Sequence, residues 1–343
     1  MKNNNKHEKT TRSILIHSPN WLGDVIMCFP AFRAWRTANP DARVYILAKK
    51  SVAGLWSYVR DIDGVISFSK EKAAMRAASQ AIRAAGCKEA ILLPHSFRSA
   101  WIVWRGGVSE IRGTTGQFRS FMITDPVSIE DLENEHQAFE YRRIMGLDDT
   151  VELPAPSAAV DLSRFPSVPE FASAPAKPLI ILPGAARGNS KRWPAEYFAS
   201  AALTLMERHA ELPVIVCGTP DEANACSDVA TAIAAKYPER VVNACGKTKL
   251  PELAALIAKA SAVCCNDSGG MHLSTAIGTP VVAVFGITDP SKTGPLGVSR
   301  VVAAKGYKVS RAIPRESPTA TEALASVKPE AVISALEDFL AHA

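Results

Sequence analysis

Short apolar runs alternate with longer segments whose apolar residues recur at helical spacing along most of the chain. The short runs predict strands at residues 13–18, 43–48, 64–69 and 89–94, and again at 178–184, 213–218, 262–267 and 280–286. The longer segments predict helices at 24–38, 71–86, 194–209, 221–237, 250–260, 269–278 and 328–343. Strands that are apolar on both faces and separated by helices are typical of parallel sheets covered by helices on both sides.

A proline-rich segment divides this pattern into two halves. Six prolines fall between residues 154 and 178 with no periodic apolar run among them, which is typical of a connector between domains. The sequence therefore predicts two Rossmann-like, doubly wound α/β domains, at residues 12–153 and 179–326, with a linker at 154–178. For the final helix, at 327–343, packing back on the N-terminal domain stays open.

Composition narrows the class of protein. No segment reaches the ~20 apolar residues that a membrane-spanning helix needs. The basic segment before the first strand leads into no signal-peptide core, so we expect a cytoplasmic protein.

The seven cysteines are odd in number and lie mostly in apolar runs, which favours core positions over disulfides or zinc ligands. The net charge of +5 comes without a nucleic-acid-binding signature but suits a phosphorylated glycan or an anionic membrane surface.

Ligands of parallel sheets bind beyond the carboxyl ends of the strands, so the loops after the strands are the candidate sites. The first such loop, SPNWLGD at 18–24, ends in Asp24 at the start of a helix. Two interpretations of Asp24 stay open. It either caps backbone N–H groups of the helix, or it is a carboxylate, kept ionised by the helix dipole, that accepts a proton from a sugar hydroxyl.

Cationic side chains mark two further segments of the N-terminal half. The loop at 93–101, LPHSFRSAW, offers Ser96 as a helix N-cap and Arg98 as an anion ligand. The stretch IRGTTGQFRS places Arg112 and Arg119 in a glycine- and threonine-rich loop. Several arginines after strands suggest a docking surface for phosphate or carboxylate groups.

The C-terminal half carries loops suited to a diphosphate. PGAARGNSKRWP at 183–194 combines small residues with Lys191 next to a helix start, and CNDSGGMH at 265–272 can present consecutive backbone N–H groups. Asp267 and His272 flank that glycine turn. The one GKT, at 246–248, lacks the first glycine of a nucleotide-triphosphate loop, and no G-x-G-x-x-G follows the first strand.

Taken together, these motifs resemble those of a known enzyme family. They are NWLGDV at 20–25, LPHSFRSA at 93–100, RGTTG at 112–116, Glu135-His136, PGA at 183–185 with KRWP at 191–194, and NDSGGMH at 266–272. Their order and content, from about residue 13 to 340, resemble the ADP-heptose:lipopolysaccharide heptosyltransferases (glycosyltransferase family 9), and most of all the heptosyltransferase II branch. The resemblance implies the GT-B fold, with two Rossmann-like domains facing across a cleft.

The resemblance also implies roles for particular residues. Asp24 is expected to act as the general base. The residues expected to bind the nucleotide-sugar donor are Lys191, Glu222, Thr248, Asp267, Ser268, Gly269 and His272, with Glu222 on the adenosine ribose. The residues expected to face the acceptor are Asn20, Trp21, Ser96, Arg98 and Arg112.

The implied reaction moves heptose from ADP-heptose to a heptosyl-Kdo-lipid A acceptor in the inner core of lipopolysaccharide, with inversion at the anomeric carbon. No cofactor or metal is required in this reading. The implied partners are the donor, a lipid-linked glycan and, through a peripheral contact, the inner membrane, but no nucleic acid. Three alternatives stay open: a family member with another donor or acceptor, a nucleotide-sugar-binding module without turnover, and a two-domain epimerase.

Overall fold

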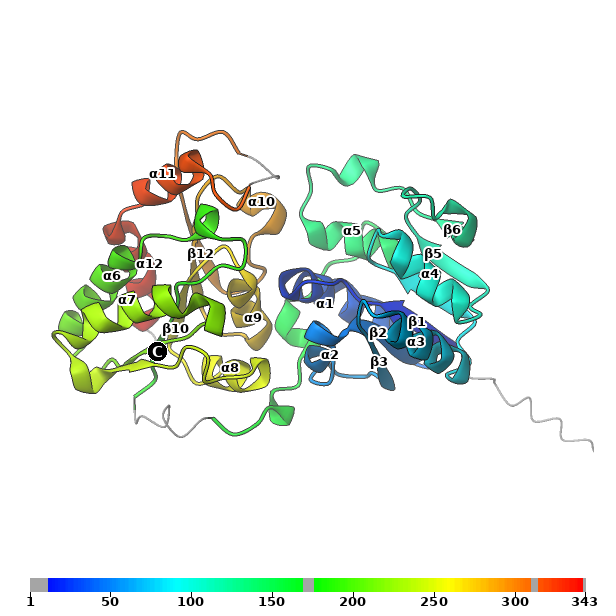
Figure 1. Ribbon diagram of the computed structural model, residues 1–343, viewed down its shortest axis with the longest axis horizontal. Coiled ribbons are helices and arrows are strands. Elements are labelled where there is room, and N and C mark those ends of the chain that lie inside the picture. Colours follow the sequence, from blue (N-terminus) through cyan, green and yellow to red (C-terminus); the bar gives the residue numbers. More distant parts are fainter. Residues whose placement is uncertain (1–11, 169–175, 310–313, 342–343) are drawn as a thin grey trace, which may run out of the picture. The chain divides into compact units, whose positions relative to one another are not determined.

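The computed structural model describes residues 12–168, 176–309 and 314–341, which form two compact units (Figure 1). The first unit comprises the chain up to Asn20, Ala31–Glu133 and Phe139–Leu153. The second comprises Trp21–Pro30, Asn134–Ala138 and the chain from Pro154 onward. Two short segments of the N-terminal half thus cluster with the second unit. The pattern of strands and helices in the sequence does not predict this clustering.

The first unit is built on a parallel sheet in the strand order β3-β2-β1-β4-β5-β6. Its strands are β1 (Ser13–His17), β2 (Arg43–Lys49), β3 (Gly64–Phe68), β4 (Glu89–Leu92), β5 (Glu110–Gly113) and β6 (Asp125–Pro126). The central strand β1 pairs with β2 on one side and β4 on the other, and its Leu15 and Ile16 are buried on opposite faces. All four strands expected in this half are confirmed.

Helices cover this first sheet. They are α1 (Leu22–Ala38), α2 (Lys50–Trp56), α3 (Lys72–Ala84), α4 (Phe97–Arg105) and α5 (Gln137–Ile144), with short 3-10 turns η1 (Ser120–Met122) and η2 (Glu130–Leu132). Helix α1 contains Pro30, which lacks the N–H needed for an i→i−4 bond. The division between the two units falls directly after this proline.

The second unit repeats the same architecture. Its parallel sheet has the order β12-β11-β10-β7-β8-β9. The strands are β7 (Leu179–Leu182), β8 (Val214–Val216), β9 (Val241–Asn243), β10 (Ala262–Asn266), β11 (Val281–Phe285) and β12 (Ser299–Ala303). The helices are α6 (Ala195–Arg208), α7 (Ala223–Ala234), α8 (Leu250–Ile257), α9 (Gly269–Ile277), α10 (Pro290–Thr293), α11 (Pro318–Ser326) and α12 (Pro329–Leu340). The 3-10 turns are η3 (Pro156–Ala159), η4 (Leu162–Arg164), η6 (Asn189–Lys191), η7 (Pro220–Glu222) and η8 (Pro238–Arg240).

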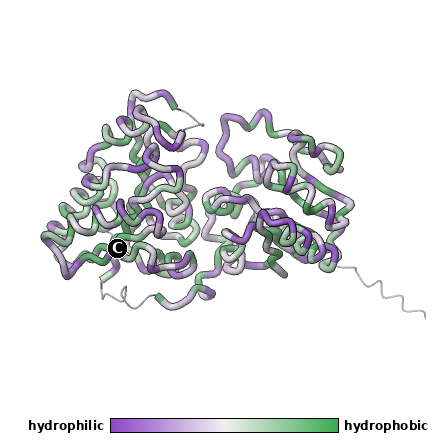
Figure 2. Tube along the Cα trace, viewed as in Figure 1, coloured by the Kyte–Doolittle hydropathy of each residue, from purple (hydrophilic) through white to green (hydrophobic). Residues whose placement is uncertain are grey.

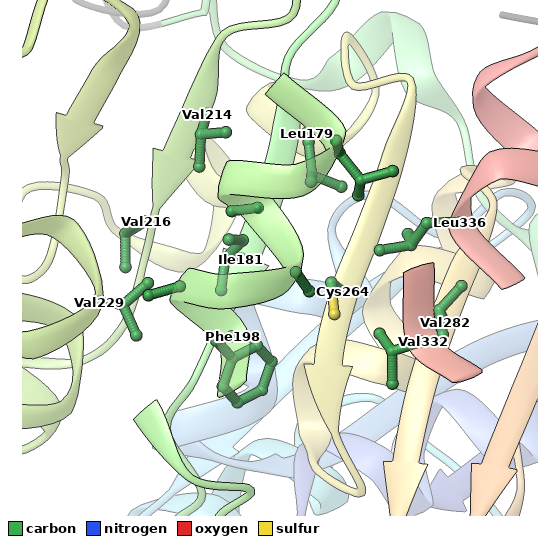
Figure 3. Close-up of a cluster of buried hydrophobic side chains, with 14 of the residues drawn as sticks. Leu179, Ile181, Phe198, Val214, Val216, Val229, Cys264, Val282, Val332 and Leu336 are labelled. Carbon is green, nitrogen blue, oxygen red and sulfur yellow. The ribbon is translucent and has the colours of Figure 1, made fainter. Parts of the chain in front are cut away.

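Alternate residues of the strands point to the same face of the sheet and form the larger core of this unit. Leu179 and Ile181 of β7 point to the same face and meet Phe198 of α6 there (Figure 3). Val332 and Leu336 of α12 belong to the same cluster. In Figure 2 the interior strands are mostly green and the outer loops largely purple, as the hydrophobic effect requires of such a fold.

Helix α12 has packing partners in the second unit. The sequence left room for this helix to pack back on the N-terminal domain. In the structure it packs against α6 and β10 of the second unit, where Val332 and Leu336 are fully buried. Its apolar residues belong to that core, as expected of an amphipathic helix.

Both sheets share one strand order, in which successive strands are added first on one side and then on the other side of the first strand. In the first sheet this switch point lies between β1 and β4, and in the second between β7 and β10. The four loops that follow these strands are the four that the sequence marked as candidates. Because ligands of doubly wound sheets bind at the switch point, each unit presents its candidate loops where such a fold binds ligands.

The cysteines behave as the sequence predicted. All seven are free thiols, and all except Cys245 are buried. Burial raises the pKa of the Cys264 thiol to about 12 and that of Cys87 to about 11, so these groups stay protonated. No helix within the described residues is long and apolar enough to cross a membrane.

Candidate functional site

The predicted donor residues all lie in the second unit, in the loops or first helical turns after four neighbouring strands of its sheet. In chain order these are Lys191 after β7, Glu222 after β8, Thr248 after β9, and Asp267, Ser268, Gly269 and His272 after β10. Carboxyl ends of parallel strands share one edge of a sheet, so residues far apart in sequence are brought to that edge.

An ion pair joins the two loops at the switch point. Lys191 Nζ lies 2.5 Å from Asp267 Oδ2, and the two side chains are only 18% and 8% exposed. A pair that is this well shielded keeps much more of its Coulomb energy than a surface pair does. The ammonium is therefore held in place beside the start of α9.

The start of α9 has the features that suit an anion. Ser268 is the N-cap residue, its backbone is extended, and its hydroxyl makes no capping bond. The first N–H groups of a helix have no partner within the helix, and the dipole adds positive potential there. Gly270 lets the turn approach β7, since a Cβ at this position would lie 2.4 Å from Leu182 Cδ1.

The carboxylate of Glu222 lies across the ends of β7 and β8. A Cβ on Gly184 would come within 2.1 Å of Glu222 Cδ, and one on Gly218 within 3.1 Å of Glu222 Oε2. The Thr219 N–H donates to Glu222 Oε2 over 2.8 Å and fixes one carboxylate oxygen. The two glycines therefore make the space that the carboxylate fills.

Asn266 is a positioning residue that sequence reasoning missed. Its buried amide donates to Pro183 O over 2.8 Å, and its Oδ1 accepts from the Trp193 N–H over 2.8 Å. One side chain thus ties the end of β10 to both ends of the loop that carries Lys191. The only sequence signal was its place directly before Asp267, at the end of an otherwise apolar strand.

Two histidines complete this end of the second unit. His272 is buried, and burial is the main cause that lowers its pKa to about 4, so its imidazole is neutral at pH 7. His136 Nδ1 accepts from the Ala138 N–H, which leaves Nε2 to donate to Gly294 O over 3.1 Å. This pairing fixes the tautomer of His136, and burial lowers its pKa as well.

Asp24 lies in the first turn of α1, within the stretch Trp21–Pro30 that belongs to the second unit. Its neighbour Gly23 packs on His272: a Cβ there would lie 2.8 Å from His272 Cδ2. Leu22 packs on Gly269 in the same way. The start of α1 therefore rests on the start of α9, with the Asp24 carboxylate one residue from the contact.

The predicted acceptor residues lie mostly in the first unit. Ser96 is the N-cap of α4, as expected, and its Oγ accepts from the Ser99 N–H. Arg98 is exposed on the first turn of that helix, and Asn20 is half-buried in the loop after β1. Trp21, the next residue, is 67% exposed.

The expectation for the arginines of the stretch 111–120 is partly wrong. Arg112 lies on β5 rather than in a loop. Its guanidinium donates to Ile144 O and Arg143 O at the end of α5 and pairs with Asp125. Arg119 is buried and donates to Pro94 O over 2.6 Å and to Thr114 Oγ1. Both guanidiniums are used to join segments of the chain, because carbonyl groups at strand and helix ends are strong acceptors.

His17, at the end of β1, is fully buried beside the Phe68 ring. Neither of its ring nitrogens has a hydrogen-bond partner among the described residues. Burial, with a smaller contribution from the charge of Arg119, lowers its pKa to about 3. The switch point of the first sheet therefore contains a neutral histidine and a charged arginine, and within the described residues neither forms an ion pair with a carboxylate.

Comparison with known proteins decides the family. Residues 75–320 match the sequence profile of Glycosyltransferase family 9 (heptosyltransferase). The chain belongs to this family. It is therefore a glycosyltransferase, and the family expected from its motifs is confirmed.

Individual members of glycosyltransferase family 9 are similar along most of the chain. Lipopolysaccharide heptosyltransferase 2 of Escherichia coli K12 is 26% identical over 299 residues, which cover 82% of this chain and 85% of that protein. Lipooligosaccharide heptosyltransferase 2 of Haemophilus influenzae is 27% identical over 354 residues, which cover 96% and 99%.

Solved structures of the family confirm the GT-B fold. E. coli ADP-heptose LPS heptosyltransferase II aligns with a TM-score of 0.79 at 24% identity, over 96% of this chain and 98% of that one. A family 9 glycosyltransferase from Veillonella parvula aligns with a TM-score of 0.78 at 21% identity, over 97% and 98%. In the described residues, no group of three or more His, Cys, Asp or Glu side chains is arranged to hold a metal ion.

Proposed function

We propose that this glycosyltransferase moves heptose from ADP-heptose to a heptosyl-Kdo-lipid A acceptor in the inner core of lipopolysaccharide, with inversion of the sugar. The names of similar proteins support the substrates: both relatives described above are heptosyltransferases 2, and the E. coli structure is that of an ADP-heptose LPS heptosyltransferase II. The observation that carries the proposal is the shielded Lys191–Asp267 pair at the start of α9, with the carboxylate of Glu222 in the turn after the neighbouring strand β8.

The donor half of the reaction needs stabilisation of negative charge as the diphosphate departs. The Lys191 ammonium and the first N–H groups of α9, at Ser268 and Gly269, supply it from fixed positions. Donors that are preorganised in this way stabilise developing charge without reorganising during the reaction. Glu222 accepts hydrogen bonds from the adenosine ribose, and Thr248 lines the nucleotide.

The acceptor half needs a base. Asp24 takes the proton from an acceptor hydroxyl as the oxygen attacks the anomeric carbon, and ADP leaves from the opposite face, so the sugar inverts in one displacement. The dipole of α1 keeps Asp24 ionised, and the proton moves as the new C–O bond forms, which suits a carboxylate of low basicity. The packing of Gly23 on His272 supports this role because it brings Asp24 close to the donor loop.

The acceptor is expected to meet Asn20, Trp21, Ser96 and Arg98. For Arg112 an acceptor role requires that the guanidinium leave its present partners Ile144 and Asp125. Since the acceptor carries a lipid anchor, the reaction takes place at the cytoplasmic face of the inner membrane, through a peripheral contact. No cofactor takes part in the proposed reaction.

The first experiment is product analysis by mass spectrometry. Purified protein is mixed with ADP-heptose and heptosyl-Kdo-lipid A, and wild type is compared with Asp24→Asn. We expect wild type to add one heptose and the variant to lose about 10²–10⁴ in rate, the usual contribution of a general base. ADP affinity, measured by calorimetry, should stay within about twofold of wild type.

A matched control is Asp61→Asn, which removes a carboxylate that pairs with Arg33 in the first unit. This variant should transfer heptose at the wild-type rate. Full activity of Asp24→Asn would instead reduce Asp24 to a helix cap. No product from wild type despite ADP binding would favour another donor or acceptor, and failure with a wide set of acceptors would favour a binding module. Isomerisation of the donor without acceptor would indicate an epimerase.

A further inference from the structure

Helix α4 in the first unit is apolar on two faces. Its inner face, with Ala100, Ile102 and Val103, belongs to the core under the first sheet. Its outer face carries Phe97 and Trp101, which are 40% and 39% exposed. A surface helix ordinarily has one apolar stripe, so a second, exposed stripe requires another explanation.

The outer face forms a continuous aromatic surface. The rings of Phe97 and Trp101 stack with centroids 5.9 Å apart, and Trp101 and Trp104 follow at 5.3 Å. Phe121 of η1 closes the ring of contacts, 6.3 Å from Trp104 and 6.5 Å from Phe97. We call these four residues the aromatic patch.

The loop before Phe121 is held in a strained conformation that adds to this exposure. Gln117 and Phe118 both have positive φ, +48° and +57°, a region that non-glycine residues rarely adopt. Phe118 is 93% exposed. The buried Arg119 guanidinium anchors the loop on Pro94 O and Thr114 Oγ1. Strain of this kind persists where the surrounding structure enforces it, and it is concentrated at functional sites.

Cations border the aromatic patch. Helices α3 and α4 pack side by side (Figure 1) and enclose a groove of about 640 Å³. Lys72, Arg76, Arg83 and Arg105 line it together with Trp101, and none of its lining residues is acidic. The Arg105 guanidinium lies over the Trp101 ring, 5.8 Å from its centroid. Aromatic and cationic groups therefore form one surface.

The combination of tryptophan and arginine selects the occupant. Tryptophan rings favour the boundary between hydrocarbon and water, and basic side chains beside them attract anionic headgroups. A second copy of the chain, docked face to face, would bring the same cations against one another. We propose that the aromatic patch and the groove between α3 and α4 dock this protein on an anionic lipid bilayer.

The proposal deepens the proposed function, because a lipid-linked acceptor gives the docking its purpose. The phosphate of an anionic headgroup occupies the groove, between Arg76 and Arg105. The rings of Trp101, Trp104 and Phe121 enter the interfacial layer. Such a contact is peripheral and reversible, and high salt weakens it because the cations are exposed to solvent.

The test measures binding of the full chain to vesicles. Wild type is mixed with vesicles of phosphatidylglycerol and phosphatidylethanolamine, or of phosphatidylcholine alone, and bound protein is quantified by co-sedimentation. We expect binding to the anionic vesicles only, and weaker binding in 0.5 M salt. Trp101→Gln/Trp104→Gln and Arg76→Gln/Arg105→Gln should each reduce the partition coefficient by about tenfold or more. Leu162→Gln and Lys259→Gln, at exposed positions of the second unit, are the matched controls.

Transfer assays separate this inference from the proposed function. With a delipidated, water-soluble acceptor the patch variants should keep wild-type rates, and with acceptor embedded in vesicles they should lose about tenfold. Vesicle binding without transfer to either acceptor would overturn the function and leave the docking surface standing. Transfer to the soluble acceptor without vesicle binding would overturn the docking surface alone. In ultracentrifugation, wild type could sediment as a dimer and the patch variants as monomers. That result would identify the surface as a self-interface and overturn the proposal.

Discussion

The two sheets have the same strand order, yet their switch points are equipped differently. In the second unit the loops after β7 and β10 are joined by an ion pair, Lys191–Asp267, and by the amide of Asn266. In the first unit, with its switch point between β1 and β4, His17 at the end of β1 is a neutral imidazole, and the loop after β4 is held by Arg119, whose acceptors are the neutral oxygens of Pro94 and Thr114. The topology provides the edge on which ligands bind, but the side chains decide what each edge can bind.

This difference separates the tasks of the two halves. A helix N-terminus next to a fixed ammonium suits the diphosphate of a nucleotide sugar. The first unit instead displays an exposed aromatic patch and a basic groove, which suit a partner that is both anionic and apolar. One fold thus supports two kinds of binding through changes in a few residues per loop.

The largest effect is expected at the ion pair. Lys191→Met should lower kcat for heptose transfer about 10²–10³-fold, since it removes a fixed charge at the departing diphosphate. It also leaves the buried Asp267 carboxylate unpaired, which destabilises the fold. The double variant Lys191→Met/Asp267→Asn should recover thermal stability without recovering kcat, as measured by melting curves and steady-state rates. A double variant that regains activity would assign the pair a purely structural role.

The next effect concerns acid stability of the first unit. The unfolded chain binds a proton on His17 near pH 6.5, whereas the folded chain binds it only near pH 3. Stability therefore falls as pH drops through this window, by about 3 kcal/mol at pH 4. His17→Phe keeps an aromatic ring beside Phe68 and removes the proton site. Urea unfolding at pH 7 and pH 4 should show a smaller loss for this variant, and equal losses would contradict the assignment.

The smallest effect is expected at Gly184. The Cβ of Gly184→Ala would overlap Glu222 Cδ, so the carboxylate must move. We expect ADP affinity to fall about tenfold, or about 1.4 kcal/mol, by calorimetry. Gly54→Ala is the matched control, because a Cβ there meets nothing within 4 Å. If Gly184→Ala/Glu222→Ala binds ADP as tightly as wild type, Glu222 does not contact the ribose.

Much of the fold could be predicted from the sequence because its central strands are apolar on both faces. The strands that escaped prediction are at the sheet edges or carry polar residues. Ser299–Ala303 has exposed positions, Val241–Asn243 has only three residues, and Glu110–Gly113 is interrupted by Arg112. The burial of residues in these three strands depends on neighbours elsewhere in the chain, so their sequences show no periodic apolar pattern.

The candidate site also contains residues that could be predicted from the sequence and residues that could not. The loops could be found because glycine, lysine and aspartate after apolar strands have few other uses. Asn266 and Arg112 could not be assigned, because their partners are backbone carbonyls of residues distant in sequence, such as Pro183 and Ile144. Spacing along the chain carries no information about which carbonyl a side chain will meet.

The membership of Trp21–Pro30 in the second unit has a consequence for biosynthesis. These residues leave the ribosome early, but the other parts of their unit, Asn134–Ala138 and the chain from Pro154 onward, are translated much later. The first turns of α1 can pack into their unit only after these later segments have been synthesised. Val25 and Ile26, both buried in the finished protein, belong to this segment. Nascent chains paused before the second unit should therefore be the species that chaperones hold most strongly.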